Sequence, residues 1–286
     1  MQTKQLICLF FLLATGASLA HEGDSDSVDE IVFYGRAEAL LGTALSASEG
    51  LVGYADLELA PLLRVGELVE AVPGMVATQH SGTGKANQYF LRGFNLDHGT
   101  DFSATVDGVP INMRTHGHGQ GYLDLNFMIP ELVESVVYRK GPYSPKNGDF
   151  SSAGSAAFSL TERFNETLVR ATVGEFGHLR GFAAGSVDAG NTVVSGAIDA
   201  TVYEGPWELD EDLQQFRFFA GLSGSLGGLD GRVSLMGYSG EWNSTDQVPN
   251  RAVESGAISR LGFIDPDLGG STDRFSLTGH LSSDNW

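Results

Sequence analysis

The sequence predicts a mixed α+β domain followed by antiparallel strands of a transmembrane β-barrel. Up to about residue 163, short helix and strand patterns alternate. Beyond it, segments of roughly ten residues alternate large apolar with small or polar side chains. Gly accounts for 38 of 286 residues, and only 19% of residues are charged. A soluble β-sandwich has the same alternation. The Gly content, an apolar N-terminal segment and tight turns that alternate with long loops favour the barrel.

Composition excludes several classes of protein. Lys and Arg number 17 against 36 Asp and Glu, which gives a net charge of −19. No basic cluster is present, so we expect no nucleic-acid partner. The sequence has no Gly-x-Ser-x-Gly or His-Glu-x-x-His motif, and we therefore expect neither an enzyme nor a cofactor.

Residues 1–20 are predicted to be a signal peptide. Lys4 precedes the apolar run Leu6–Ala14, and Ser18-Leu19-Ala20 forms a cleavage site, so the mature chain would begin at His21. Past Ala20 no stretch of 18 apolar residues occurs, which excludes a helical membrane span. The single cysteine lies within the signal peptide, so no disulfide is expected.

The region before residue 164 has five recognisable elements. An acidic leader precedes a β-prone segment, and a short amphipathic helix ends at Pro73-Gly74. Three strands follow, separated by loops rich in Asn, Asp, His and Gly. In order, the elements are 29–35, 64–72, 88–94, 103–111 and 132–138.

Six strands of barrel length are predicted after residue 164. Their loops or turns hold most of the acidic residues of this region, as expected if the strands cross a membrane. They are Thr167–Gly174, His178–Asp188, Asn191–Tyr203, Gln214–Ser225, Gly231–Glu241 and Arg274–Ser282.

Five motifs, in order over about 115 residues, resemble the plug domain of TonB-dependent outer-membrane receptors. The first resembles a TonB box, the second a helix that ends in Val-Pro-Gly, and the third an Ile-Arg-Gly motif. The fourth matches Val-Asp-Gly-Val-Pro, and the fifth resembles a strand that ends in Arg-Gly-Pro. They are Asp29–Phe33, Val65–Met75, Phe90–Phe94, Val106–Pro110 and Pro130–Pro142.

The resemblance implies a domain organisation. The leader at 21–49 would carry the TonB box at 29–35, the plug would span 50–163, and 164–286 would be the first part of the barrel. The family's barrel has about 22 strands, and only six fit here. We therefore expect an incomplete 22-stranded barrel, and read the chain as an N-terminal fragment of a longer receptor.

The resemblance assigns TonB binding to Asp29, Glu30, Ile31, Val32 and Phe33. Such a role needs an extended, detachable strand with a free edge for strand addition. A β-prone heptapeptide behind a flexible leader supplies that edge. Without the resemblance, a first strand fixed in the fold is the preferred alternative.

Arg92 and Lys140 are candidates for contact between plug and barrel. Arg92 lies among apolar neighbours, where a charge needs a carboxylate partner. An exposed arginine at a strand end is an equal alternative. Lys140 stands where the family usually has Arg, and Lys cannot form Arg's bidentate fork.

Four of the seven histidines lie in Gly-rich loops, at positions 80, 98, 116 and 118. His98, Arg114, His116 and His118 are candidates for ligand contact, because His-x-His suits Zn, Cu, Ni or Fe. Loop hydrogen bonding or packing is the preferred alternative. A direct ion site needs three or four donors, and the sequence offers three. Contact with a metal chelate is therefore favoured over coordination of an ion, and the metal stays unknown.

The resemblance implies an energy-coupled importer in the outer membrane of a Gram-negative cell. Its partners would be the periplasmic domain of TonB, outer-membrane lipid and a scarce small-molecule ligand, most often an iron–siderophore or another metal chelate. A non-transporting surface receptor or adhesin, and a secreted all-β binding domain, are the alternatives.

Overall fold

The computed structural model describes residues 46–60, 62, 64–79, 82–226 and 228–283, which all fall within one structural unit. The predicted signal peptide and TonB box lie outside the described residues. No helix among the described residues is long and apolar enough to cross a membrane.

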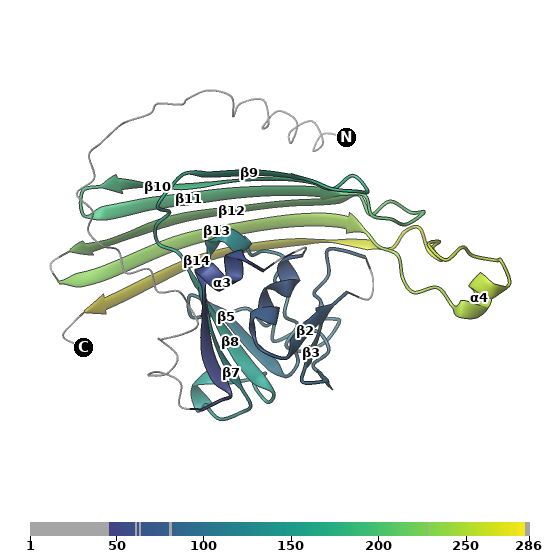
Figure 1. Cartoon of the computed structure of the whole chain (residues 1–286), viewed down its shortest axis with the longest axis horizontal. Coiled ribbons are helices and arrows are strands. Elements are labelled where there is room, and N and C mark those ends of the chain that lie inside the picture. Colours follow the sequence, from purple (N-terminus) through teal and green to yellow (C-terminus); the bar gives the residue numbers. More distant parts are fainter. Residues whose placement is uncertain (1–45, 61, 63, 80–81, 227, 284–286) are drawn as a thin grey trace, which may run out of the picture. The chain divides into compact units, whose positions relative to one another are not determined.

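The N-terminal part, up to residue 160, is built on a five-stranded sheet in the order β1-β7-β8-β5-β6 (Figure 1). β5 and β8 run parallel, and the other neighbours run antiparallel. Buried side chains of β5, β7 and β8 form much of the core, including Phe102, Val136 and Phe158. The strands are β1 (Glu49–Gly53), β5 (Phe102–Val106), β6 (Val109–Pro110), β7 (Val133–Lys140) and β8 (Gly154–Leu160).

Short helices and a second sheet complete this part. The predicted helix is present as the 3-10 helix η1 (Val65–Ala71), which buries Leu68 and Val69. Pro73-Gly74 follows it, and Gly74 has a φ of +87° that favours glycine. The other elements are α3 (Tyr54–Glu58), η2 (Pro130–Leu132), η3 (Pro145–Asn147) and the three-stranded sheet of β2 (Met75–Thr78), β3 (Gln88–Leu91) and β4 (Phe94–Asn95).

The strand predicted over 88–94 is wrong in part, because the chain reverses within it. Arg92 and Gly93 have φ values of +54° and +80°. Two successive residues with positive φ form the tight turn that matches the twist of a hairpin. β3 therefore pairs with β4 across this turn.

The strand predicted over 103–111 is divided in the same way. Asp107 and Gly108 have φ values of +45° and +78°, and β5 pairs with β6 across them. Asp-Gly is among the strongest hairpin signals in a sequence.

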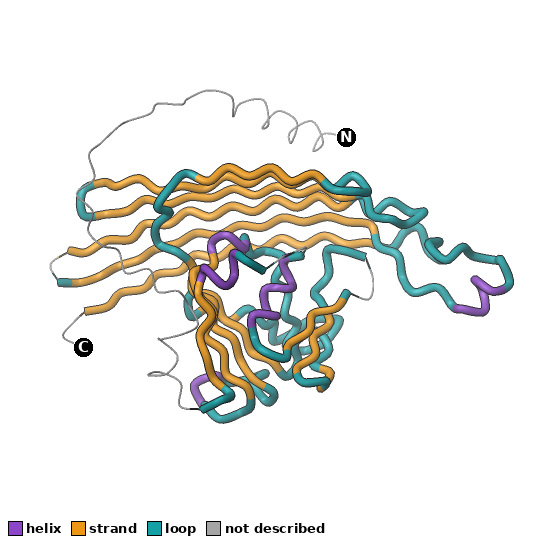
Figure 2. The backbone as a smooth tube through the Cα atoms, in the orientation of Figure 1, coloured by secondary structure: helices purple, strands orange, loops and turns teal. Residues whose placement is uncertain are grey.

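The C-terminal part is a six-stranded antiparallel meander in the order β14-β13-β12-β11-β10-β9 (Figures 1 and 2). All six predicted strands are confirmed, although β14 begins five residues earlier than expected. The unpredicted helix α4 (Asn250–Glu254) lies in the long connection before β14. The strands are β9 (Leu168–Val173), β10 (Leu179–Ala189), β11 (Thr192–Tyr203), β12 (Leu213–Leu226), β13 (Leu229–Asn243) and β14 (Gly269–Ser283).

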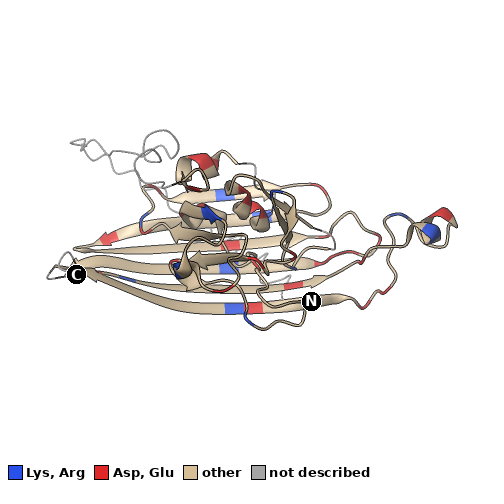
Figure 3. Cartoon of the chain, turned by 90° about the horizontal axis from the view of Figure 1, so that it is seen from below, with Lys and Arg blue, Asp and Glu red and all other residues tan. Residues whose placement is uncertain are grey.

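The two faces of the meander differ in chemistry. One face exposes apolar side chains, with Val173 79% and Leu277 74% exposed. The opposite face buries polar ones, with Asp199 1% and Arg217 3% exposed. Charged residues are sparse along the strands (Figure 3). A soluble sandwich buries its apolar face, whereas barrel strands in a membrane turn it outward. The exposed apolar side chains include Val169, Val187, Val194, Phe216, Leu222, Val233, Leu235, Phe275 and Leu281.

Candidate functional site

An ionic cluster joins the N-terminal part to the polar face of the meander. Arg180 donates from Nη1 and Nη2 to the two carboxylate oxygens of Glu131, at 2.8 and 2.7 Å. Its Nε donates to Asp199, at 2.6 Å. Asp199 also accepts from Arg217, whose Nε reaches the backbone oxygen of Asn126. Each buried charge in this chain of contacts therefore has a charged partner, as buried ions require.

The surroundings of Glu131 keep it ionised. Burial by itself raises the pKa of this carboxyl, but hydrogen bonds from Arg180 and the charges of Arg180 and Arg170 lower it further than burial raises it. Arg170 lies 3.0 Å from Glu131 Oε1. The net pKa is below the ordinary value, so the contact is a true ion pair at neutral pH.

Two further arginines of the meander reach the N-terminal part. Arg232 lies 3.3 Å from Asp107 Oδ2 and donates to the backbone oxygen of Leu160 at 2.9 Å. The guanidinium of Arg274 stacks over Phe127, 4.1 Å from the ring centroid. These two arginines were not predicted from the sequence. Each is the single Arg of its strand, β13 or β14, and it stands at a polar position of the alternating pattern. That position is the signal in the sequence that could have identified it.

The two residues predicted for plug–barrel contact lie elsewhere. Arg92 is exposed in the β3–β4 turn. Lys140 is buried, with Nζ 5.5 Å from the ring centroid of Tyr138. Burial and the positive charge of Arg92 lower the pKa of Lys140. Among the described residues neither side chain forms an ion pair, and their contact with a barrel wall stays a prediction.

Three of the predicted histidines come together. The rings of His98 and His118 meet edge to face, with centroids 4.3 Å apart. His116 stacks on Tyr122, with centroids 3.9 Å apart and planes 11° apart. The backbone N–H of His118 donates to Nδ1 of His116, at 3.1 Å. Two separate loops thus bring three imidazoles to one place. We call these three histidines, with Asp97, the histidine cluster.

His98 is held in one orientation. The ring is 4% exposed, and its Nδ1 lies 3.0 Å from the backbone oxygens of both Ala86 and Asn87. Two acceptors there require a proton on Nδ1, so in the neutral ring Nε2 is the nitrogen that carries the lone pair. Nε2 lies 3.7 Å from Asp97 Oδ1. Burial and the neighbouring His118 lower the pKa of His98 against the opposing effect of Asp97, which favours a neutral ring.

The buried side chain of Asn112 ties the two loops together. Its Nδ2 lies within 3.1 Å of the backbone oxygens of Gly99, Phe102 and Gly121. Its Oδ1 accepts from the N–H of Ala104, at 2.8 Å. Gly99 follows His98 and Gly121 ends the loop of His118, so one amide sets the spacing of the histidine cluster.

The other predicted contacts are more dispersed. Arg114 is exposed at the start of the loop that the Met113–Tyr122 bridge closes. His80 lies outside the described residues, as do the TonB-box residues Asp29, Glu30, Ile31, Val32 and Phe33.

A cavity of about 470 Å³ opens beside His116 and His118. Its far wall comes from β13 and β14. Burial raises the pKa of Asp124 in its wall, although hydrogen bonds from Asn126 lower it in part. The wall of this cavity thus combines polar and aromatic side chains. Other lining residues are Tyr122, Trp242 and Arg274.

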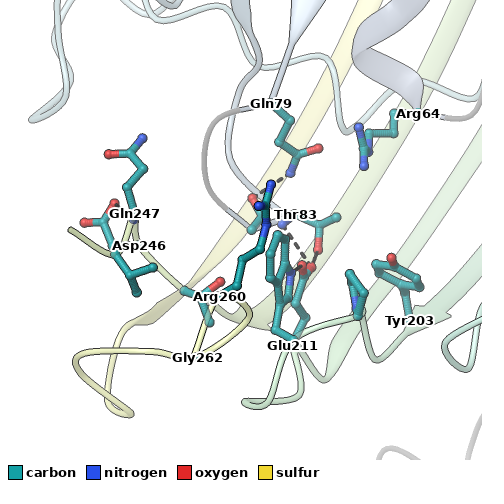
Figure 4. A pocket seen from close by; sticks show the side chains of 14 residues that line it. Arg64, Gln79, Thr83, Tyr203, Glu211, Asp246, Gln247, Arg260 and Gly262 are labelled. Atoms are coloured by element: carbon teal, nitrogen blue, oxygen red, sulfur yellow. Dashed lines mark hydrogen bonds between the residues drawn. The ribbon is translucent and has the colours of Figure 1, made fainter. Parts of the chain in front are cut away.

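A second cavity, of about 440 Å³, lies under the long connections of the meander (Figure 4). Glu211 is its central acid. This carboxylate accepts from the backbone N–H of Thr83 at 3.0 Å and from Trp207 Nε1 at 2.6 Å. Arg64 and Arg260 also line the cavity. This cavity was not predicted from the sequence, because it forms from segments more than 100 residues apart.

Residues 43–155 match the family model of the TonB-dependent receptor plug domain. Solved receptors share the fold at low sequence identity. The ferripyoverdine receptor of the Pseudomonas aeruginosa outer membrane has a TM-score of 0.62 at 14% identity, and the match covers 82% of this chain and 31% of that one. The siderophore receptor PirA of Acinetobacter baumannii has a TM-score of 0.56 at 18% identity, with 84% and 38% covered. The copper transporter OprC has a TM-score of 0.55 at 13% identity, with 70% and 31% covered.

The fold is thus that of a receptor whose barrel strands pack around a plug. Residues 43–155 are similar to the plug domain of TonB-dependent receptors, and the strands that follow have the fold of part of the barrel in these solved receptors. The chain spans about a third of the length of these solved receptors.

Proposed function

We propose that this protein is a TonB-dependent transporter of the Gram-negative outer membrane that takes up a metal-containing ligand. The observation that carries the proposal is the ionic cluster around Glu131. It holds the plug against the polar face of strands whose other face is apolar. A polar contact of this kind suits a plug that closes a barrel and can be displaced. The apolar face suits strands that contact lipid.

The connections of the meander suggest which end faces the ligand. Short turns join β10 to β11 and β12 to β13, whereas long loops cover 204–212 and 244–268. Outer-membrane barrels carry their long loops outside the cell. Both cavities include residues from that end, such as Trp207 and Trp242. The ligand would therefore enter from outside and meet the plug at the histidine cluster.

Energy would come from TonB. Residues 1–20 would direct the chain to the periplasm and be removed after Ala20. The plug would cover about 50–163 and the barrel strands 164–286. The segment Asp29–Phe33, ahead of the plug, would pair with TonB by strand addition. Force on this segment would then displace the plug. Candidate ligands are an iron–siderophore and other metal chelates, because the solved receptors with this fold include siderophore receptors and a copper transporter.

The proposal is tested by measuring ligand binding and accumulation side by side in whole cells. We expect deletion of Asp29–Gly35 to abolish accumulation of radiolabelled ferric siderophore or metal and to leave surface binding intact. Val32→Pro should act similarly, because proline removes a ladder donor.

Val28→Pro is the matched control, since it places proline in the leader just outside the segment. It should accumulate ligand normally. Normal accumulation by the deletion variant would remove the TonB-box assignment, and binding without accumulation in wild-type cells would favour a non-transporting receptor.

A further inference from the structure

Asp97, His98 and His118 bring three metal-ligating atoms close together. One donor atom from each residue lies within 4.8 Å of the other two. A metal with bonds of about 2.0–2.1 Å in tetrahedral geometry holds its donors about 3.3 Å apart. The 3.7 Å separation of His98 Nε2 from Asp97 Oδ1 is close to that spacing. The donor atom of His118 lies within 4.8 Å of the other two and would move closer to complete the set.

The three donors combine one buried, oriented imidazole with two exposed side chains. His98 is buried and held through Nδ1, whereas Asp97 and His118 are exposed. The hydrogen bonds of Nδ1 to Ala86 and Asn87 carbonyls aim Nε2 at the other two donors. A backbone carbonyl behind a ligating histidine is the usual outer partner in metal sites, because it fixes tautomer and orientation.

His116 supports the set from behind. Its ring stacks on Tyr122, and its Nδ1 accepts the backbone N–H of His118. This hydrogen bond fixes the short loop that carries His118. His116 is thus a positioning residue for His118.

We propose that Asp97, His98 and His118 coordinate a divalent transition-metal ion directly on the plug. Two imidazoles and one carboxylate suit zinc and its neighbours copper, nickel and cobalt. Three protein donors leave a coordination position open, and the cavity of about 470 Å³ beside His118 provides room for water or an exchanging ligand. An open position suits a site that must release its ion. The species bound at this site is therefore a bare ion. Its passage across the membrane rests on the proposed function.

The first test measures zinc binding to the full-length protein purified in detergent, by isothermal titration calorimetry. Asp97→Asn and His118→Ala should each raise the dissociation constant at least about tenfold, the smallest effect expected when even an outer-shell partner is lost. His178→Ala is the matched control, because this histidine lies in a loop of the meander outside the cluster. Its zinc affinity should stay at the wild-type value.

The second test uses Cu²⁺ as a spectroscopic probe, since a buried residue such as His98 is poorly tested by truncation. Electron paramagnetic resonance of the wild-type protein should show coupling to two imidazole nitrogens. His118→Ala should leave one. His116→Ala should weaken binding yet keep two, because His116 positions His118 and does not ligate. Unchanged zinc affinity in both Asp97→Asn and His118→Ala, or copper coupling unaffected by His118→Ala, would overturn the site.

These results separate the site from the transporter. Zinc binding that depends on the cluster, without TonB-dependent accumulation, would support the site and contradict the proposed function. TonB-dependent accumulation of a ferric siderophore by protein that fails to bind zinc would overturn the site alone.

Discussion

Arg180 and Glu131 face each other through two parallel hydrogen bonds, of 2.8 and 2.7 Å, between the meander and the plug. Bidentate contacts of this kind are among the stronger and more directional polar interactions in proteins. The residues are 49 positions apart in the chain. Their pairing fixes where β10 lies against the start of β7, and it anchors the network that continues through Asp199 to Arg217.

Glu131→Gln should loosen the plug. The change keeps the size of the side chain but leaves the guanidinium of Arg180 with one carboxylate in place of two. We expect the free energy of unfolding of the plug to fall by about 1–3 kcal/mol, as for a lost hydrogen bond to a charged group. Limited proteolysis of the plug in rising urea measures it. Glu134→Gln, an exposed acid in β7, should leave the urea midpoint unchanged, and an equal shift in both variants would contradict the role of the ion pair.

The same contact should weaken in acid. The pKa of Glu131 is lower in the folded protein than its ordinary value of 4.5. A carboxyl with a lowered folded pKa adds stability above its unfolded pKa, and that stability is lost as pH falls through the folded pKa. The difference in urea midpoint between the wild type and Glu131→Gln should therefore be constant near neutrality and shrink progressively below about pH 4.5. A difference that grows in acid would refute the ion pair.

Asn112→Ala should disorder the histidine cluster from a distance. Its amide is buried and contacts four backbone groups, so truncation leaves buried partners unpaired at a cost of about 1–3 kcal/mol. Amide hydrogen exchange should accelerate at Gly99 to Ala104 and at Gly121. Asn165→Ala, in an exposed loop, serves as the control and should leave these exchange rates as they are.

Leu277→Arg tests whether the exposed apolar face meets lipid. Leu277 is 74% exposed, and in water such a substitution changes stability by at most about 0.5 kcal/mol. Facing the middle of a bilayer, it should cost about 2–4 kcal/mol. Heat-modifiable folded protein in outer-membrane fractions should therefore fall. Leu261→Arg, an exposed apolar residue of the β13–β14 loop, should accumulate normally. Equal yields of both variants would place Leu277 in water.

Much of the fold could be predicted because its signals are local. Alternation along each strand gives six barrel strands, and Leu68 and Val69 mark the buried side of a helix. The two hairpins that were not predicted turn at Arg92-Gly93 and Asp107-Gly108. At each, the chain reverses within a run of β-prone residues that was predicted as one strand. The second had a readable signal in Asp-Gly. The first did not, because Arg seldom adopts positive φ.

The candidate site was predictable only in part. Gly-rich loops pointed to His98, His116 and His118, which the structure brings together. Asp97 was missed although it precedes His98, because its direction depends on a φ of +52° that no local pattern indicates. Finding this carboxylate beside two imidazoles is what shifts the expectation from a chelate to an ion. The Glu131–Arg180 pair depends on packing between distant segments, which residue spacing does not encode.

The polar face of the meander has a consequence for repeated use. Hydroxyl, amide and charged groups such as Ser195, Gln215 and Arg217 line it, and Arg217 can exchange the backbone oxygen of Asn126 on the plug for water at modest net cost. The same face also buries Phe182, Phe219 and Met236, so parting of the two surfaces would expose apolar as well as polar groups. When the plug moves, water would take over the polar contacts, whereas the exposed apolar side chains would favour its return to the same position.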